Sequence, residues 1–512
     1  MVKPGKPEEK SDSDSKTLFK QSGISGIGRF VRIFFNYVQA VILTNILGPT
    51  QFGIYVLARN TGQVFSLLGG LGLGPTLTRL IPAGKEGSEH RAERLTKYSL
   101  VVSFTVSLAV SVVLFIASDP IAKSFFNQPE LGSVLKWFSF AIPIQSLLLV
   151  VYGVLRGHKL IPSRVLAENI LFPISSISFI LLFNLVFPPL SAAISAFFLA
   201  HLITLIYAGY IANSFTQFLS KWSLMGPVDT QEKKEVNSFA APLLLSSSAD
   251  YIQKWADTFM LGILSSSSAV GIYAVSMRVG GFIQIPLTAF NMVFAPMISE
   301  MASLGETKRL AENYKLVTRT VLILSLPIFG LVVLAPVQIL SVFGKAFAES
   351  HCAFVLICFG QLVNVSVGST GQVLVMTGRA KLHLVNSVIF LVLTVLLNWF
   401  LIPRYGIIGA AVANMITLGL LNLMRVFQIY MDLKIHPLSH GFFKTLAFAI
   451  VSLCLVGLVS YYLFPVDGWL PAFFRVTTFF ISYGSLVIGF GLGSEEKMLL
   501  NKIIKKLPKW KK

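Results

Sequence analysis

The stretch NILGPTQFGIYVLAR, residues 45–59, joins two apolar segments through the short polar turn GPTQ. A similar stretch, GILSSSSAVGIYAVSMR at 262–278, again leads from a short loop into a segment that begins Gly-Ile-Tyr. Downstream, GPTLTRLIPAGKEGSEHRAERL (74–95) resembles APMISEMASLGETKRLAENY (295–314). The separation of roughly 220 residues corresponds to six apolar segments, and an internal repeat of six helices is typical of secondary transporters with a site between their halves.

The composition is that of a membrane protein that crosses the bilayer many times. The 512 residues are 54% hydrophobic and 13% charged, about half the charged fraction of an ordinary soluble domain. Because roughly 20 apolar residues span the hydrocarbon core as a helix, we predict an all-α fold with about 14 transmembrane helices. They are predicted at 23–47, 52–81, 97–118, 134–155, 165–186, 190–213, 238–264, 269–299, 315–342, 351–378, 382–402, 407–432, 445–464 and 472–491.

The predicted helices form two bundles of six, followed by two additional helices. The first 20 residues lack the apolar core of a signal peptide, and the basic amphipathic C-terminal segment is expected to lie on the anionic inner leaflet. The predicted parts are a disordered tail (1–20), an N-terminal bundle (21–213), a cytoplasmic connector (214–237), a C-terminal bundle (238–433), two additional transmembrane helices (445–491) and a basic tail (492–512).

The basic residues predict how the chain is oriented. The formal net charge is +19 at pH 7, and Lys and Arg gather in every second loop, as in the cytoplasmic loops of membrane proteins. Since the loops on the other side are short and poor in these residues, both termini are predicted to be cytoplasmic, in a cell (inner) membrane. Basic residues beside membrane helices need no nucleic acid to explain them, so no nucleic-acid partner is expected.

Several polar residues of the first predicted helix share one helical face. They recur at the spacing i, i+3, i+7, i+10, and they are Arg29, Arg32, Asn36 and Gln39. An ionisable group near the bilayer centre costs several kcal/mol, which favours a face that lines a protein cavity. The two arginines also lie close enough to the cytoplasmic end for their side chains to reach the interface, and the sequence leaves both interpretations open.

Two further arginines belong to the second and eighth predicted helices. Arg59 shares a helical face with Gln63, and Arg278 stands at nearly the repeat-equivalent place. A guanidinium group is permanently charged and binds phosphate or carboxylate through two parallel hydrogen bonds. A cavity lined by these arginines is therefore predicted to bind an anion, and no cofactor or metal ion is expected.

Glycines are dense in GGLGLGPT, residues 69–76. The stretch lies in a predicted membrane helix and lacks the Lys-Ser/Thr pair of a phosphate-binding loop. These glycines are therefore predicted to allow close helix packing.

The segment SADYIQKWADTFMLG, residues 248–262, places three ionisable groups on one face of the seventh predicted helix. Asp250, Lys254 and Asp257 are spaced i, i+4, i+7. Lys254 can pair with either aspartate across one turn, which would make the group a structural salt bridge. Alternatively, the remaining carboxylate couples transport to H+ or Na+, because burial makes its charge sensitive to its neighbours.

Three stretches carry a family resemblance: LTNILGPTQFGIYVLARNTGQVFSLLGGLGLGPTLTRLIP (43–82), ADTFMLGILSSSSAVGIYAVSMRV (256–279) and LNWFLIPRYGIIGAAVANMI (397–416). They resemble the polysaccharide-transporter branch (Wzx/RfbX-like flippases) of the multidrug/oligosaccharidyl-lipid/polysaccharide (MOP) exporter superfamily. The resemblance implies two six-helix bundles around a central cavity, which move a polyprenyl-(di)phosphate-linked oligosaccharide across the membrane by alternating access. The two additional helices are similar to those of lipid II flippases, a likeness that implies diphosphate binding by Arg29 or Arg32, Arg59 and Arg278.

The resemblance also implies partners and competing functions. A glycan polymerase or transferase is an expected partner, and a monomer is the expected state. The alternative is a cation-coupled drug or metabolite exporter of the related multidrug antiporter branch, for which carboxylates rather than arginines are expected in the N-terminal half. An enzyme is disfavoured because the predicted outer loops are too short for a catalytic domain, so His201 and His383 are expected to be packed, hydrogen-bonded residues.

Overall fold

The computed structural model describes residues 7–82, 89–217, 228–463 and 468–491. Over these residues the chain consists of helices and short connections, without a β-strand. The helices belong to two compact units, Met1–Ala274 and Val275–Lys512, which are described separately below. The predicted all-α class is confirmed.

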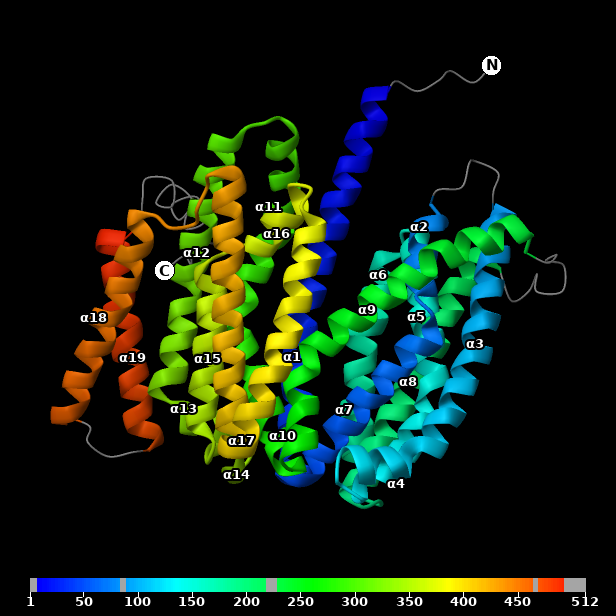
Figure 1. Ribbon diagram of the computed structural model, residues 1–512, viewed down its shortest axis with the longest axis horizontal. Helices are drawn as coiled ribbons and strands as arrows, with labels where there is room; N and C mark the ends of the chain where they lie inside the picture. The colour runs from blue at the N-terminus through cyan, green and yellow to red at the C-terminus, as the bar shows by residue number, and fades with distance from the viewer. Residues whose placement is uncertain (1–6, 83–88, 218–227, 464–467, 492–512) are drawn as a thin grey trace, which may run out of the picture. The chain divides into compact units, whose positions relative to one another are not determined.

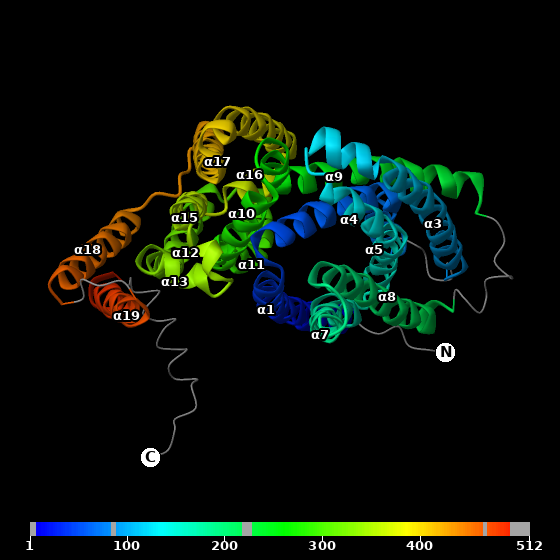
Figure 2. The same cartoon turned by 90° about the horizontal axis from the view of Figure 1, so that it is seen from below.

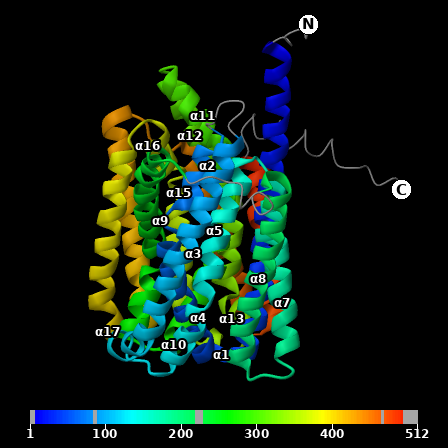
Figure 3. The ribbon, with the colours of Figure 1, turned by 90° about the vertical axis from the view of Figure 1, so that its right-hand side faces the viewer.

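Among its described residues, the first unit contains nine α-helices and the start of a tenth. They are α1 (Pro7–Gly70), α2 (Leu73–Leu80), α3 (Glu89–Pro120), α4 (Glu130–Ser139), α5 (Ala141–Gly157), α6 (Ile161–Leu166), α7 (Phe172–Phe183), α8 (Pro189–Thr216), α9 (Thr230–Leu264) and α10 (Ser267–Gly280). Short π-helical turns follow α3 and α6, at Ile121–Phe125 and Ala167–Leu171. Figure 3 shows α7 and α8 side by side along their length.

Helix α1 contains the first two predicted membrane helices, joined at a kink. Gly48 has φ 65° and ψ 177°, a conformation that glycine adopts without the steric cost that a Cβ would add. Pro49 follows directly and cannot donate the hydrogen bond that would continue a helix. The polar turn GPTQ is therefore where the chain reverses, and Figure 1 shows the two limbs of α1 in blue on either side of it.

The glycine-rich stretch after α1 brings α2 close to α5 and α9. Leu71 and Gly72 both have positive φ, 48° and 69°, which interrupts the second predicted helix. A Cβ atom on Gly74 would lie 2.3 Å from the carbonyl oxygen of Leu149, and one on Gly153 would lie 2.2 Å from the carbonyl oxygen of Gly74. Only residues without a side chain allow this approach, so the predicted packing role of these glycines is confirmed.

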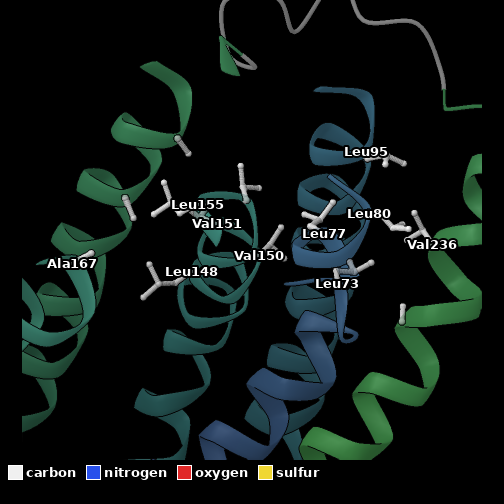
Figure 4. Packing of buried hydrophobic residues seen from close by; sticks show 14 residues of the cluster. Leu73, Leu77, Leu80, Leu95, Leu148, Val150, Val151, Leu155, Ala167 and Val236 are labelled. Atoms are coloured by element: carbon white, nitrogen blue, oxygen red, sulfur yellow. The ribbon is translucent and has the colours of Figure 1, made fainter. Parts of the chain in front are cut away.

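A cluster of leucine, valine and alanine side chains holds the first unit together around α2 and α5. Leu73, Leu77 and Leu80 lie on one face of α2 and are almost completely buried. In Figure 4 they meet side chains of α5 such as Val150 and, on their other side, Val236 of α9. Since lipid is as apolar as these side chains, close van der Waals packing rather than exclusion of water stabilises the contact.

In the part that the structure describes, the second unit contains the end of α10 and nine further α-helices. They are α11 (Ile285–Ser303), α12 (Thr307–Leu334), α13 (Pro336–Ser341), α14 (Lys345–Ala348), α15 (His351–Ser366), α16 (Thr370–Met376), α17 (Ala380–Leu433), α18 (His440–Leu463) and α19 (Trp469–Leu486). Helix α17 is kinked at Gly406, with φ 55° and ψ −128°, and its two limbs lie next to each other in Figure 1. Figure 2 shows α18 and α19 as neighbours.

The membrane-spanning segments account for the predicted number. Among the described residues, nine helical segments are long and apolar enough to span a bilayer, and two of these, Gly28–Gly70 and Ala380–Leu433, each contain two helices joined at a kink. Two bent pairs pass the same test together, α4 with α5 at 45° and α15 with α16 at 42°. With α9, which carries the charged triad, these segments correspond to the predicted 14 helices.

The predicted division into bundles at 21–213 and 238–433 follows the sequence repeat and stays a prediction. Helix α1 begins at Pro7, within the segment 1–20 that the sequence predicts to be a disordered tail. The basic tail at 492–512 and residues 218–227 of the connector lie outside the described residues.

Candidate functional site

Arg32 on α1 is joined to the α6 region through a glutamate. Its Nη1 atom lies 2.8 Å from Oε1 of Glu168, and Oε2 of Glu168 lies 2.8 Å from Nη2 of Arg164. One carboxylate is thus shared by two guanidinium groups, which leaves one net positive charge. The Arg32 side chain is still 40% exposed, so it can contact a ligand while it holds Glu168.

Sequence analysis did not find Glu168 as the partner of Arg32. The two residues are 136 positions apart, and no local pattern links positions so distant. The available signal was the i, i+4 spacing of Arg164 and Glu168, which predicts an ion pair along one helical face.

The other polar residues of the first predicted face have different surroundings. Gln39 is buried and donates a hydrogen bond of 2.6 Å to Oγ of Ser176, so it joins α1 to α7. Arg29 and Asn36 are half-buried, and Arg29 forms no ion pair within the described part of the chain. The structure therefore uses Gln39 for helix packing, while the cavity role of the whole face stays a prediction.

Arg59 lies where α1, α8 and α9 meet. Its guanidinium carbon is 5.8 Å from the ring centre of Phe197 on α8, an arrangement in which the aromatic face attracts the cation. The next residue, Asn60, is buried and accepts a hydrogen bond of 3.2 Å from Oη of Tyr251 on α9. No carboxylate among the described residues forms an ion pair with Arg59. Gln63, one turn further, is half-buried.

His201 is a packed residue, as predicted. Its Nδ1 atom lies 2.8 Å from the carbonyl oxygen of Phe197. The ring lies against Phe172 and Phe197, with centre distances of 4.4 and 4.2 Å. It therefore stabilises the contact between α7 and α8.

The charged triad of α9 is divided between two environments. Asp257 is 6% exposed and accepts a hydrogen bond of 2.9 Å from Oη of Tyr273 on α10. Asp250 and Lys254 are exposed, and the ammonium nitrogen of Lys254 lies 5.7 Å from the ring centre of Trp255. The structure thus gives Asp257 a buried hydroxyl donor, and the choice between a structural salt bridge and ion coupling stays open.

The two Gly-Ile-Tyr motifs contact each other inside the first unit. A Cβ atom on Gly53 would lie 1.7 Å from the carbonyl oxygen of Ser267, and one on Gly271 would lie 2.2 Å from the carbonyl oxygen of Pro49. The tyrosines of both motifs, Tyr55 and Tyr273, are buried. The glycines therefore place α10 directly against the second limb of α1, next to the Asp257 carboxylate.

Ion pairs join the first turns of α3 and α9. Arg94 donates a hydrogen bond of 2.8 Å to Oε1 of Glu232, and Arg91 pairs with Glu235. Glu232 also forms the capping box of α9 with Asp229. The hydrogen bond from Arg94 holds the pKa of Glu232 below its usual value, so this carboxylate stays charged and keeps the two helix starts together.

Arg278 belongs to the second unit, in the last turn of α10, and is half-buried. Its grouping with Arg29, Arg32 and Arg59 in one binding site stays a prediction. Within the first unit, the structure brings Arg32 to Glu168 and Arg59 to the aromatic residues of α8 and α9.

Comparison with family models decides the family. The model of the polysaccharide biosynthesis protein family matches residues 18–302, more than half of the chain. The chain belongs to the polysaccharide biosynthesis protein family. The MatE family model also matches, at residues 242–400. Together the two matches confirm the resemblance to the MOP superfamily that the three sequence stretches indicate.

Curated relatives of this polysaccharide biosynthesis family protein include two from Haloferax volcanii. It is 24% identical to the probable low-salt glycan biosynthesis flippase Agl15 over 377 residues, which cover 72% of this chain and 74% of Agl15. It is 32% identical to the probable flippase AglR over 180 residues, 34% of this chain. That match spans only 37% of AglR.

Among solved structures, the family member is similar to the lipid II flippase MurJ in an inward closed conformation. The TM-score is 0.71 and the identity 12%, with 93% of this chain and 99% of that chain covered. At this identity the similarity shows a shared fold. It confirms the membrane fold with two additional C-terminal helices.

Proposed function

We propose that the protein is a flippase that moves a polyprenyl-(di)phosphate-linked oligosaccharide across the cytoplasmic membrane by alternating access. The transported glycan would serve cell-surface polysaccharide or glycoprotein assembly. The family match and the flippase names of Agl15 and AglR support this assignment. The single observation that carries it is Arg59, a half-buried cation within a membrane-spanning helix that has no carboxylate partner among the described residues.

The arginines of the first unit have chemically distinct roles in this proposal. Arg59 binds a phosphate oxygen, because a guanidinium without a counter-ion in a low-dielectric setting gains most from an anion. Arg32 contacts the second phosphate and exchanges part of its interaction with Glu168 for it. Arg29 and Arg278 supply further positive charge to the diphosphate.

The remaining assignments follow from a flippase. We attribute no catalytic activity to the chain and expect no cofactor, because moving a lipid between leaflets breaks no covalent bond. A cell membrane location with both termini cytoplasmic is supported by the Lys and Arg distribution. We expect a monomer that passes its cargo to a glycan polymerase or transferase.

The experiment is a flipping assay with the purified chain in proteoliposomes. A fluorescent polyprenyl-diphosphate sugar is placed in both leaflets, and a membrane-impermeant quencher reports its movement. Arg59→Ala is expected to lower the initial rate at least about tenfold, because a hydrogen bond to a charged group contributes about 1.5–3 kcal/mol.

A matched control removes another arginine. Arg309 is exposed and pairs with Glu306 at 2.8 Å, so Arg309→Ala should leave flipping unchanged. Circular dichroism and gel filtration show whether each variant is folded. A folded Arg59→Ala protein that flips as fast as the wild type would refute the anion site.

A second candidate function is a cation-coupled drug or metabolite exporter, which the MatE match at 242–400 favours. In that case the same proteoliposomes would accumulate a cationic dye when a proton or sodium gradient is applied. They would also fail to move the polyprenyl-diphosphate sugar.

A further inference from the structure

Arg425 is a membrane-embedded arginine in the second unit that sequence analysis did not single out. It lies in the second limb of α17, eight residues before the end of the helix at Leu433, or about 12 Å at 1.5 Å per residue. The residue is half-buried, and its Nε atom is buried without a hydrogen-bond partner among the described residues.

The described carboxylates nearby do not neutralise Arg425. Asp432, on the same limb, lies 2.7 Å from Nε of Arg379. No ion pair of Arg425 occurs within the part of the chain that the structure describes. A guanidinium group with a buried, unpartnered nitrogen in a membrane helix is costly, and a bound anion would offset this cost.

His383 and Arg425 both lie next to Gly371. A Cβ atom on Gly371 would lie 3.4 Å from Cε1 of His383 and 3.7 Å from Nη1 of Arg425. These are the two nearest heavy atoms outside the helix, at ordinary van der Waals distance. The imidazole, from the first limb of α17, and the guanidinium, from the second, thus face the same small volume.

The side-chain amides one turn to either side of Arg425, Asn422 and Gln428, each form hydrogen bonds with other residues. Asn422 donates to Oδ1 of Asn364 at 2.9 Å and accepts from Thr370. Gln428 and Asn386 form a reciprocal pair, at 2.7 and 2.9 Å. These contacts engage the amide oxygens nearest to Arg425 in sequence.

We propose that Arg425 and His383, which both border Gly371, bind a lipid phosphate ester. Arginine binds phosphate through parallel hydrogen bonds, and a histidine nitrogen can donate a further one. The limb at 407–433 is about 40 Å long, roughly 10 Å longer than the hydrocarbon core. Arg379 and Lys434 lie at its polar end, so Arg425 lies close to the level of lipid phosphates.

Two sources supply this chemistry: the diphosphate of the transported carrier and the headgroup of an anionic membrane phospholipid. The site is built from residues of the second unit. Its assignment to the carrier rests on the proposed function, whereas its assignment to a membrane phospholipid does not.

The experiment measures lipid binding to the delipidated full chain by native mass spectrometry. The probes are farnesyl diphosphate, phosphatidylglycerol and inorganic pyrophosphate, with phosphatidylcholine as a neutral headgroup. Arg425→Gln should weaken binding of at least one lipid probe about tenfold or more, the effect of losing a hydrogen bond to a charged group. Lys434→Gln removes an exposed charge from the same helix end and should change the affinity less than about twofold.

A second variant keeps the charge of Arg425 and adds bulk beside it. Gly371→Val places methyl groups against His383 and Arg425 and should weaken the same probe as Arg425→Gln. It also decides the question if Arg425→Gln does not fold.

Each pattern of binding has a defined meaning. Selective loss of farnesyl diphosphate assigns the site to the carrier, and loss of phosphatidylglycerol assigns it to a membrane phospholipid. Three outcomes would overturn the proposal. In the first, only pyrophosphate binding is weakened. In the others, Arg425→Gln and Gly371→Val both leave lipid affinity unchanged, or Lys434→Gln weakens binding as much as they do. Arg59→Ala should leave this lipid binding intact. A failure of the proposed function in the flipping assay can therefore be distinguished from a failure of the Arg425 site.

Discussion

Glu168 determines how much positive charge the arginine region of the first unit carries. Its two carboxylate oxygens each bind a different arginine, Arg32 and Arg164. Without the carboxylate, two guanidinium groups would lie close together in a partly desolvated setting, where like charges repel more strongly than in water. An entering phosphate can take over the same two hydrogen-bonding partners.

We therefore predict that Glu168→Gln lowers the thermal stability of the detergent-purified protein by about 1–3 kcal/mol, the usual cost of leaving a hydrogen-bonding group without its partner, because the Glu168 side chain is partly exposed. Pyrophosphate should raise the melting temperature of this variant more than it raises that of the wild type. Differential scanning fluorimetry with and without pyrophosphate measures both effects.

The control for this prediction is Glu306→Gln, which removes the carboxylate of an exposed pair with Arg309. Exposed pairs contribute about 0–1 kcal/mol, so its melting temperature should barely change. Equal melting temperatures for the two variants would contradict a central role for Glu168.

At the residue scale, the sequence predicts which residues are unusual but not what they contact. Arg32, Arg59 and Asp257 stand out because a charge in an apolar helix is costly. Their partners Glu168, Phe197 and Tyr273 belong to other helical segments, which the local sequence does not reveal. Arg425 was missed because it lies near a helix end, where a charged side chain usually reaches water.

At the scale of elements, the helices are predictable because their signal is local. A run of apolar residues near the length of the bilayer predicts a membrane helix from its own sequence. The kinks at Gly48 and Gly406 lie in GPTQ and PRYG, which separate predicted helices in the sequence. The interruption at Leu71–Gly72 was not predicted, since hydrophobicity continues through it and the backbone changes conformation only where α2 approaches α9.

Gly53→Ala tests the contact between the two Gly-Ile-Tyr motifs. The added Cβ would lie 1.7 Å from the Ser267 carbonyl oxygen, which is a backbone atom and cannot move alone. We expect a loss of about 1–3 kcal/mol, typical of overpacking, measured as a lower midpoint of unfolding in detergent.

Gly209 on α8 provides a matched glycine, because a Cβ there has no heavy atom within 4 Å. Gly209→Ala should keep or slightly raise the midpoint, since alanine favours a helix more than glycine does. If both substitutions destabilise equally, the loss at Gly53 reflects helix propensity rather than the contact.

At the scale of the whole molecule, the open question is the source of energy. A flippase that accumulates cargo on one side needs a gradient, and Asp257, with Tyr273 as its donor, is the buried carboxylate of the triad. We predict that the double variant Asp250→Asn/Asp257→Asn flips at a rate that no longer responds to an imposed H+ or Na+ gradient.

The control for this prediction is Asp119→Asn, which alters an exposed carboxylate paired with Lys136 at 2.6 Å. Its flipping rate should still rise with the gradient. Gradient-dependent flipping that persists in the double variant would assign the triad a purely structural role.

The contact between the Gly-Ile-Tyr motifs has a consequence for the origin of the chain. Gly53 meets the carbonyl of Ser267, and Gly271 meets the carbonyl of Pro49, so each glycine contacts the residue four positions before the other. This reciprocity is the property of an isologous interface, in which two identical subunits are related by a twofold axis. A gene duplication that fused two such subunits would inherit the contact, and each glycine would then be constrained by the ancestral dimer as much as by the present fold.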